Sequence, residues 1–325
     1  MYTVLTRPQQ RGRRYGVNSF DLVHTECTHR PEMSGRCPSR RGLHKPLPST
    51  KGMQPSPRSG HSAVLWGQSL LVYGGMNGET NTTSNNLFEF RSDSMAWTAL
   101  ACKGAPPRNS HAAIVHKNKM VIIGGASPEG QTMDVFLIDL ADRDNLQFHA
   151  VDCSAKKGDG CKEVGRDHVE LPLPREMHTA CLWPTLQEVE GASNKSPSVL
   201  MMGGRTAGGV EQSLFSLNLC SWEWCRLPDA PVKRCAHSAC FLENTSIMAV
   251  FGGWDGDVTI AGDLFLYDAR RREWSTVDIS PVPIGRFAHA ICAISDREIY
   301  VFGGVHPGEE LAGVTFLREL HDVVH

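Results

Sequence analysis

Five arginines each stand three residues ahead of a histidine, and these repeated pairs are the first place to look for chemistry. A guanidinium can hold a carboxylate or phosphate through two parallel hydrogen bonds, so converging arginines would favour an anionic partner. Histidines are common metal ligands, but one per repeat spreads them around the fold, and we expect no metal site. The pairs are Arg58 and His61, Arg108 and His111, Arg175 and His178, Arg234 and His237, and Arg286 and His289.

The recurrence itself supports a second interpretation of these arginines. A residue that returns in every repeat is typical of architecture, so the five arginines could instead tie down neighbouring loops. Arg205 differs, because it stands directly after a glycine pair in a single repeat, and Trp254-Asp255 occupy the matching place in another. A tryptophan at a loop tip is a plausible binding anchor, although it could also pack on the neighbouring repeat.

The elements that position these residues are apolar runs that end in two glycines. A short continuous apolar run fits a strand buried on both faces, and a glycine pair lets the chain leave the strand where a Cβ atom would clash. The spacings between the pairs are 50, 79, 49 and 51 residues, which indicates a repeat of about 50 residues. The pairs are Gly74-Gly75, Gly124-Gly125, Gly203-Gly204, Gly252-Gly253 and Gly303-Gly304.

Each glycine pair is followed by another apolar run and, in four repeats, by an aromatic residue. Asp134-Val-Phe-Leu-Ile138 and Asp263-Leu-Phe-Leu-Tyr267 are two of these runs, and Trp97 and Trp274 are two of the aromatic residues. This order resembles the kelch repeat, over roughly residues 57–318. The resemblance implies an all-β protein, a kelch-type β-propeller with five recognisable repeats, five or six blades, and four antiparallel strands per blade.

The two ends of this array are irregular. Residues 1–52 form a basic leader rich in Arg, Pro and Ser, expected to be disordered or to close part of the ring, and residues 53–325 form the propeller. The fifth repeat has no terminal Trp, so either residues 320–324 or a piece of 15–56 would supply its missing strand. The third repeat is stretched by insertions at 152–173 and 184–198, and the second of these, which contains Glu190, is expected to be an exposed loop.

Composition narrows the classes of function. Residues 1–56 hold ten Lys and Arg against three Asp and Glu, a charge of +7, and the remainder holds 23 against 32, a charge of −9. A mildly acidic body is not the footprint of a nucleic-acid-binding protein. No apolar run reaches the length of about 18 residues that a membrane helix needs. An odd count of 11 cysteines without a secretory signal favours a reducing compartment. We expect a cytoplasmic protein, with a mitochondrial one as the alternative because the leader is rich in Arg and poor in acids.

Catalytic motifs are missing from the sequence. The copper oxidases of this fold need a cross-linked Tyr and Cys, and none of the five tyrosines is placed for that role. The plant specifier proteins hold iron through Glu-x3-Asp-x3-His, whereas Glu163-x3-Asp167 is followed here by Leu171. We therefore predict no catalytic residue, no metal and no cofactor.

In a propeller, the loops after the glycine pairs and the segments before the repeat arginines emerge on one face. The sequence therefore predicts a protein-interaction module or adaptor. We expect this face to bind a protein partner that carries an acidic segment. The alternative is an enzyme or small-ligand-binding propeller that uses the polar mouth of the channel. The candidate binding residues are Arg205, Trp254, Asp255, Arg58, Arg108, Arg175, Arg234 and Arg286.

Overall fold

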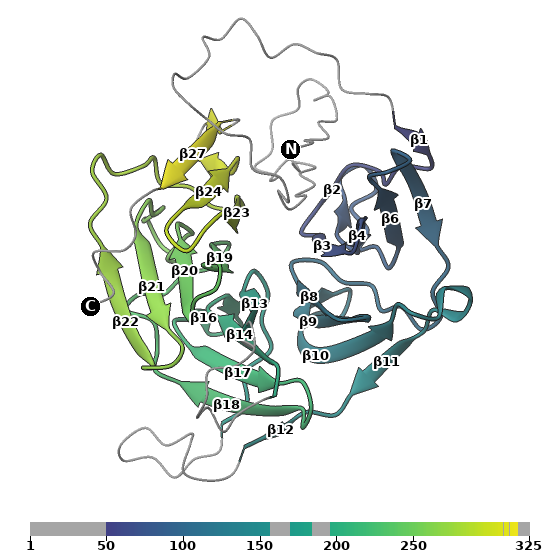
Figure 1. The fold of residues 1–325 in the computed structure, drawn as a ribbon, viewed down its shortest axis with the longest axis horizontal. Helices are drawn as coiled ribbons and strands as arrows, with labels where there is room; N and C mark the ends of the chain where they lie inside the picture. Colours follow the sequence, from purple (N-terminus) through teal and green to yellow (C-terminus); the bar gives the residue numbers. More distant parts are fainter. Residues whose placement is uncertain (1–49, 157–169, 184–195, 308, 312, 318–325) are drawn as a thin grey trace, which may run out of the picture.

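A computed structural model describes residues 50–156, 170–183 and 196–317, apart from residues 308 and 312. Among these residues, five sheets of three to five strands surround a central axis as the blades of a propeller (Figure 1), and three further sheets have two strands each. Apart from one 3₁₀ turn, η1 (Arg143–Asn145), the described residues form strands and loops, without an α-helix. The all-β propeller that the resemblance implied is therefore confirmed, and of the five or six blades predicted, the described residues form five.

Four blades have four antiparallel strands in chain order, from the innermost strand to the rim, and the fifth has three strands among the described residues. Blade one holds β3 (Ser62–Trp66), β4 (Ser69–Tyr73), β6 (Leu87–Arg91) and β7 (Ala96–Leu100). Blade two holds β8 (Ala112–His116), β9 (Lys119–Ser127), β10 (Gly130–Asp139) and β11 (Phe148–Val151). Blade three holds β13 (Thr179–Trp183), β14 (Ser198–Met202), β17 (Leu214–Asn218) and β18 (Glu223–Leu227). Blade four holds β19 (Ser238–Phe241), β20 (Ile247–Phe251), β21 (Leu264–Asp268) and β22 (Glu273–Val277), and blade five holds β23 (Ala290–Ala293), β24 (Ile299–Phe302) and β27 (Val314–Leu317).

Two short strands at the rim of the propeller pair in parallel with the outermost strands of blades one and three. β1 (Lys51–Gly52) pairs in parallel with β7, and β12 (Ser154–Ala155) pairs in parallel with β18. β1 thus lies at the end of the predicted leader, residues 1–52, where it extends the sheet of blade one. Residues 157–169, 184–195 and 318–325, which include Glu190 and the candidate closing strand 320–324, lie outside the described residues.

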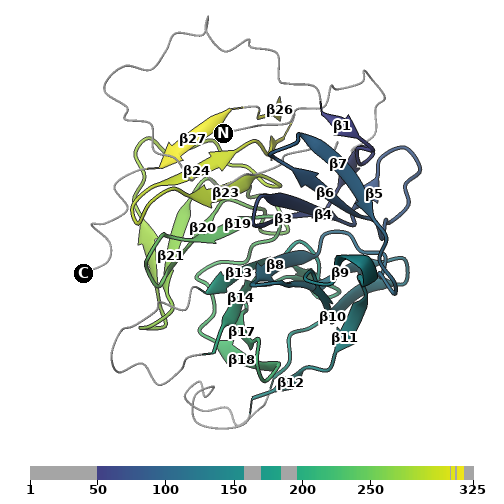
Figure 2. The same ribbon diagram turned by 45° about the vertical axis from the view of Figure 1, so that its right-hand side comes forward.

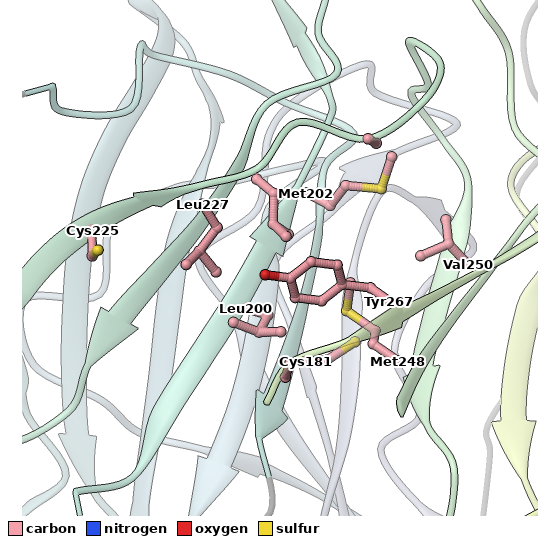
Figure 3. Packing of buried hydrophobic residues seen from close by; sticks show 11 residues of the cluster. Cys181, Leu200, Met202, Cys225, Leu227, Met248, Val250 and Tyr267 are labelled. Carbon is pink, nitrogen blue, oxygen red and sulfur yellow. The ribbon is translucent and has the colours of Figure 1, made fainter. Parts of the chain in front are cut away.

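The hydrophobic core lies between the blades. The apolar runs that end in glycine pairs become the second strands of their blades, and β4 and β20 are buried at every position. Figure 3 shows one such layer, in which Tyr267 of blade four packs among Leu200 and Met202 of blade three. Burying one such large apolar side chain stabilises the fold by about 1.5–3 kcal/mol, so the repeat of buried second strands explains why the blades hold together.

The glycine pairs are required by close packing as well as by backbone conformation. Gly124 and Gly125 have φ values of 59° and 94°, which disfavour residues with a side chain. A Cβ atom on Gly124 would lie 2.9 Å from Cε1 of His178 in the next blade. A Cβ atom on Gly125 would lie 2.7 Å from Cβ of His111 in its own blade. The first glycine thus makes room for the next blade's histidine, and the second for its own.

We expect Gly125→Val to destabilise the protein by more than about 2 kcal/mol, since a β-branched residue strains the positive φ and displaces His111. Urea unfolding measures this free energy. Gly78→Val is the matched control, because Gly78 is exposed and a Cβ atom there would have no neighbour within 4 Å. Equal unfolding midpoints for Gly125→Val and the parent chain would show that the glycine pair is not structurally required.

Candidate interaction face

The loops after the glycine pairs and the segments before the arginines lie on one face, as the strand directions predict. In every blade, the residue after the arginine pairs with the residue after the second glycine. We call the surface that these two sets of segments form the interaction face. The pairs are Ser59 with Met76, Asn109 with Ala126, Glu176 with Arg205, Cys235 with Trp254, and Phe287 with Val305.

Three of the five repeat arginines bond to the chain where it leaves their own glycine pair. Each donates from Nη1 to the carbonyl of the first glycine, and from Nε to a carbonyl two residues upstream at 3.0–3.3 Å. The Nη1 bonds join Arg58 to Gly74 at 2.9 Å, Arg175 to Gly203 at 2.9 Å and Arg286 to Gly303 at 3.1 Å. Burial lowers the pKa of Arg175 to about 10.

The other two repeat arginines reach a carboxylate instead. Arg108 donates from Nη2 to Asp134, and Arg234 donates from Nη2 to Asp263, each at 2.7 Å. These acids begin the apolar runs of the third strands. All five arginines are only 1–5% exposed and are bonded within their own blades. This arrangement matches the architectural interpretation of the repeat arginines, and the function proposed below rests on none of them.

The repeat histidines connect neighbouring blades. His178 Nε2–H donates to the carbonyl of Ile123 at 3.1 Å, and His289 Nε2–H donates to the carbonyl of Phe251 at 3.1 Å. Nε2 of His111 and Nε2 of His237 form hydrogen bonds with the hydroxyls of Ser62 and Thr179 in the preceding blades, at 2.8 Å and 2.9 Å, in which either group can be the donor.

The same histidines are held neutral. Burial lowers the pKa of each to about 3 for His111, His178, His237 and His289. The Nδ1 atoms of these four rings are buried without a hydrogen-bond partner among the described residues. A proton added at Nδ1 would therefore be an unsatisfied buried charge. These histidines serve to join blades.

Arg205 lies on the interaction face, but it is not an isolated surface charge. Its side chain is 45% exposed, and Nε and Nη2 both donate to Oε1 of Glu176, which is buried. Gln131 of blade two also donates to Glu176 Oε1, at 3.2 Å, and to the backbone carbonyl of Arg205, at 3.1 Å. Sequence reasoning missed Glu176 and Gln131. Glu176 could have been found from the sequence, because it directly follows a repeat arginine, and that position faces the residue after the glycine pair.

Trp254 and Asp255 shape the loop of blade four. Trp254 is half-buried, and its Nε1–H donates to the carbonyl of Asp257 at 3.1 Å. Asp255 accepts bonds from the backbone N–H groups of Asp257 at 2.9 Å and Thr259 at 3.0 Å. The Asp257 bond is the main reason that the pKa of Asp255 is lowered. The two residues hold this loop in one conformation while remaining on the interaction face.

Sequence reasoning also missed the apolar side chains of the interaction face. Val258 is 84% exposed, Val282 71% and Ile284 52%. They stand singly among Gly, Pro and Asp in the loops, so no periodic pattern identifies them. Only their place in the repeat indicates that these residues lie on the interaction face. Val258 is in the loop after a glycine pair, and Val282 and Ile284 are in the segment before a repeat arginine.

In the part of the chain that the structure describes, no group of three His, Cys, Asp or Glu side chains is arranged to hold a metal ion. No helix among those residues is long and apolar enough to cross a membrane. Burial raises the pKa of the Cys235 thiol, behind Trp254, to about 11, so this thiol is protonated and unreactive near neutral pH.

Comparison with known proteins places the chain in a family. A model described as the KLHDC2/KLHL20/DRC7 Kelch-repeats domain matches residues 45–181 and 191–321. The chain is 28% identical over 283 residues to the leucine-zipper-like transcriptional regulator 1 homolog of Drosophila melanogaster, covering 82% of this chain and 26% of that protein. It is 28% identical over 273 residues to Kelch domain-containing protein 2 of Bos taurus, covering 79% of this chain and 63% of that protein. It is 26% identical over 289 residues to Host cell factor 1 of Homo sapiens, covering 79% of this chain and 13% of that protein.

The chain spans less than two thirds of the length of each of these relatives. The family model, in contrast, matches far more than half of the chain. The chain therefore belongs to the kelch-repeat family, as the glycine pairs and their flanking residues predicted.

The neutral histidines make the fold sensitive to acid. Their pKa is near 3 when folded and near 6.5 when unfolded, so the unfolded chain binds more protons between these values. Stability is fully present above about pH 6.5 and is lost as the pH falls, by up to about 1.4 kcal/mol per pH unit for each histidine. Urea unfolding measured from pH 7 to pH 4 should show this slope. His178→Gln should reduce the slope by up to about 1.4 kcal/mol per pH unit, which corresponds to one proton fewer taken up on unfolding. An unfolding free energy that does not change between pH 6.5 and pH 5 would contradict the conclusion that the histidines are neutral in the folded chain.

Proposed function

We propose that this chain is a protein-interaction module that binds its partner through the part of the interaction face formed by blades three to five. One observation carries the proposal. Eight large apolar side chains are exposed among the described residues, and six of them belong to the loops or leading segments of the interaction face, all but Met53 in blades three to five. Exposed apolar residues that gather on one face are typical of interaction sites, whereas single scattered ones are not informative. The six are Met53, Leu171, Leu173, Val258, Val282 and Ile284.

Three segments lie against one another within this surface. A Cβ atom on Gly256 would lie 2.6 Å from Cγ2 of Val210, so the loop of blade four touches that of blade three. A Cβ atom on Gly285 would lie 2.1 Å from the carbonyl oxygen of Ile260, so the segment leading into blade five touches the loop of blade four. Val258, Val282 and Ile284 therefore belong to one continuous surface that Trp254 and Asp255 help to shape.

The charges beside this surface suggest how a partner is oriented. Arg205 is the half-exposed cation next to it, and its pairing with Glu176 holds the guanidinium in place. We propose a partner segment with an apolar anchor, which buries Val258, Val282 and Ile284, and with a carboxylate that meets Arg205. In such interfaces a rim charge acts mainly on the association rate, and buried apolar contacts act on the dissociation rate.

The enzymatic alternative has no specific observation in its favour. The repeat arginines and histidines that could have served at the channel mouth are bonded within or between blades. Kelch-repeat relatives of widely different length match this chain over about four fifths of its residues, which is consistent with a module that joins proteins.

Affinity capture from cells with the parent chain as bait would provide the partner, and binding kinetics would then test the face. We expect Val282→Asp together with Ile284→Asp to leave the melting temperature within about 2 °C of the parent, since exposed substitutions usually cost under about 0.5 kcal/mol. We expect the affinity for the partner to fall at least about tenfold, mainly through faster dissociation.

The charge is tested by a separate variant. Arg205→Glu is unsuitable, because it would place a second carboxylate against buried Glu176. Arg205→Gln with Glu176→Gln removes both charges while keeping hydrogen-bonding groups, and should slow association. The control is Arg270→Gln, an exposed residue in the turn between β21 and β22 on the opposite face. Normal binding by both face variants, with loss in the control, would assign the partner to the opposite face.

A further inference from the structure

A serine between two prolines lies in the segment that leads into blade one. β1 pairs with β7 at the rim, and β2 (Arg58–Ser59) pairs with β5 (Met76–Asn77) shortly before the innermost strand β3 begins. Residues 53–57 therefore cross one end of blade one from its rim toward its innermost strand (Figures 1 and 2). They contain Pro55-Ser56-Pro57, and most of them are exposed, so an enzyme can reach this part of the interaction face.

The place of Ser56 in the repeat is one whose side chain reaches the surface. In blades one, three and five, the carbonyl two residues before the repeat arginine accepts a bond from the arginine Nε at 3.0–3.3 Å, so these three segments are bonded alike. In blades three and five that position holds Leu173, which is 55% exposed, and Ile284, which is 52% exposed. In blade one it holds the hydroxyl of half-buried Ser56. A group added to this hydroxyl would therefore stand on the interaction face.

Two side-chain donors already point at the Ser56 hydroxyl. Arg58 Nη2 donates to Ser56 Oγ at 3.2 Å, and Asn77 Nδ2 donates to the same atom at 3.0 Å. The guanidinium is held in this orientation, because its Nε donates to the Ser56 carbonyl at 3.0 Å and its Nη1 donates to the Gly74 carbonyl at 2.9 Å. The positive charge of Arg58 is thus directed at one hydroxyl oxygen.

The amide of Asn77 is oriented by its own loop. Its Oδ1 accepts hydrogen bonds from the backbone N–H groups of Glu79 at 2.8 Å and Thr80 at 3.1 Å. These two bonds occupy the oxygen and leave the NH₂ group facing Ser56. The two donors around the hydroxyl are therefore fixed by bonds that do not involve it, as in a site prepared for an anion.

We propose that Ser56 is a phosphorylation site for a proline-directed protein kinase, and that Arg58 and Asn77 hold the phosphate. Such kinases act on a serine that is followed by a proline, as Pro57 follows here. The γ-phosphoryl group of ATP is transferred to Ser56 Oγ, so that a new P–O bond forms, the bond to the β-phosphate oxygen breaks to release ADP, and the hydroxyl proton passes to the base of the kinase.

The phosphate would fasten the leading segment to blade one. It carries a charge of about −1.5 to −2 and three strong acceptor oxygens, which can bond to a guanidinium and an amide at once. Because β1 and β2 anchor residues 53–57 only at their ends, these new bonds would restrain the middle of the segment. They would also place a negative charge on the interaction face beside blade one.

Ser127 provides a matched comparison, because it also precedes a proline and also lies in a loop of the interaction face. Its hydroxyl donates to the carboxylate of Glu129 at 2.7 Å, so a phosphate there would meet a negative charge instead of a guanidinium. The same modification should therefore have opposite electrostatic consequences at the two serines.

Treatment of the intact folded chain with Mg-ATP and a proline-directed kinase that phosphorylates a synthetic peptide of residues 50–62 tests the site. We expect peptide mapping to find phosphate on Ser56, and Ser56→Ala to remove it. The second pKa of this phosphate, followed by ³¹P NMR, should lie at least about 0.5 below that of the phosphorylated peptide, because Arg58 and Asn77 favour the dianion. Phosphorylation should raise the melting temperature by at least about 2 °C.

Two controls separate a held phosphate from an exposed one. Asn77→Asp keeps the oxygen that accepts from Glu79 and Thr80 but replaces the donor with a second oxygen, so it should raise the phosphate pKa to the value of the peptide or above. A phosphate placed on Ser127 should show no lowered pKa, because Glu129 is beside it.

Three results would overturn the proposal. The first is a folded chain that takes up no phosphate on Ser56 while the peptide does, and the second is a peptide that no kinase of this class accepts. The third is phosphate on Ser56 with the pKa of the free peptide and an unchanged melting temperature, which would show that Arg58 and Asn77 do not hold it. Because the pKa and the mapping are measured on the parent sequence, they decide the matter even if a variant fails to fold.

Discussion

The propeller depends on the contact between a glycine and the histidine of the next blade. The imidazole lies so close to the first glycine that a Cβ atom there would clash with it. At Gly124, that Cβ atom would lie 2.9 Å from Cε1 of His178, whose Nε2–H donates to the preceding blade. The second glycine donates its N–H to the carbonyl of the next blade's arginine, as Gly125 does to Arg175 at 2.9 Å. These contacts therefore fix how closely two blades approach and how their backbones are bonded. Because the contact requires a neutral ring in a dry place, it also connects the stability of the fold to pH.

This arrangement gives the residues with the most apparent chemistry an architectural role. Arginine and histidine recur because each blade must be closed onto its loop and joined to its neighbour. A buried guanidinium such as Arg175 is tolerated because backbone carbonyls and the hydroxyl of Ser213 satisfy its donors. The surface that remains for a partner consists of loops, which vary between blades and carry Arg205, Trp254 and the exposed apolar residues.

The fold could be predicted from the sequence because its signals repeat at fixed spacing. The glycine pairs, the Arg-x-x-His pairs and the apolar runs predicted the strands, their order and the face on which the loops emerge. The site was less predictable, because its residues come from different blades. Nothing in the sequence shows that Gln131 of blade two reaches Glu176, or that the loop of Val258 lies beside Val282 and Ile284. The positive φ of the residue before each repeat histidine could not be predicted either, because these residues are not of types that favour it. They include Ser110, Met177, Ala236 and Ala288.

The claim on which this account rests concerns the backbone hydrogen bonds that join successive blades through the residue before each repeat histidine, such as the bond from Met177 N–H to the Ser110 carbonyl at 2.9 Å. These bonds are part of the core and not a set of loop contacts. Hydrogen exchange of the amides of Ser110, Met177, Ala236 and Ala288 measures this directly, because loop amides open locally whereas core amides open only with the whole fold. The account predicts that these four amides exchange as slowly as those of β9 and β20, and that their protection falls in parallel with global stability as urea is added. Exchange at the rate of the exposed loop around Gly78, with β9 and β20 still protected, would contradict it.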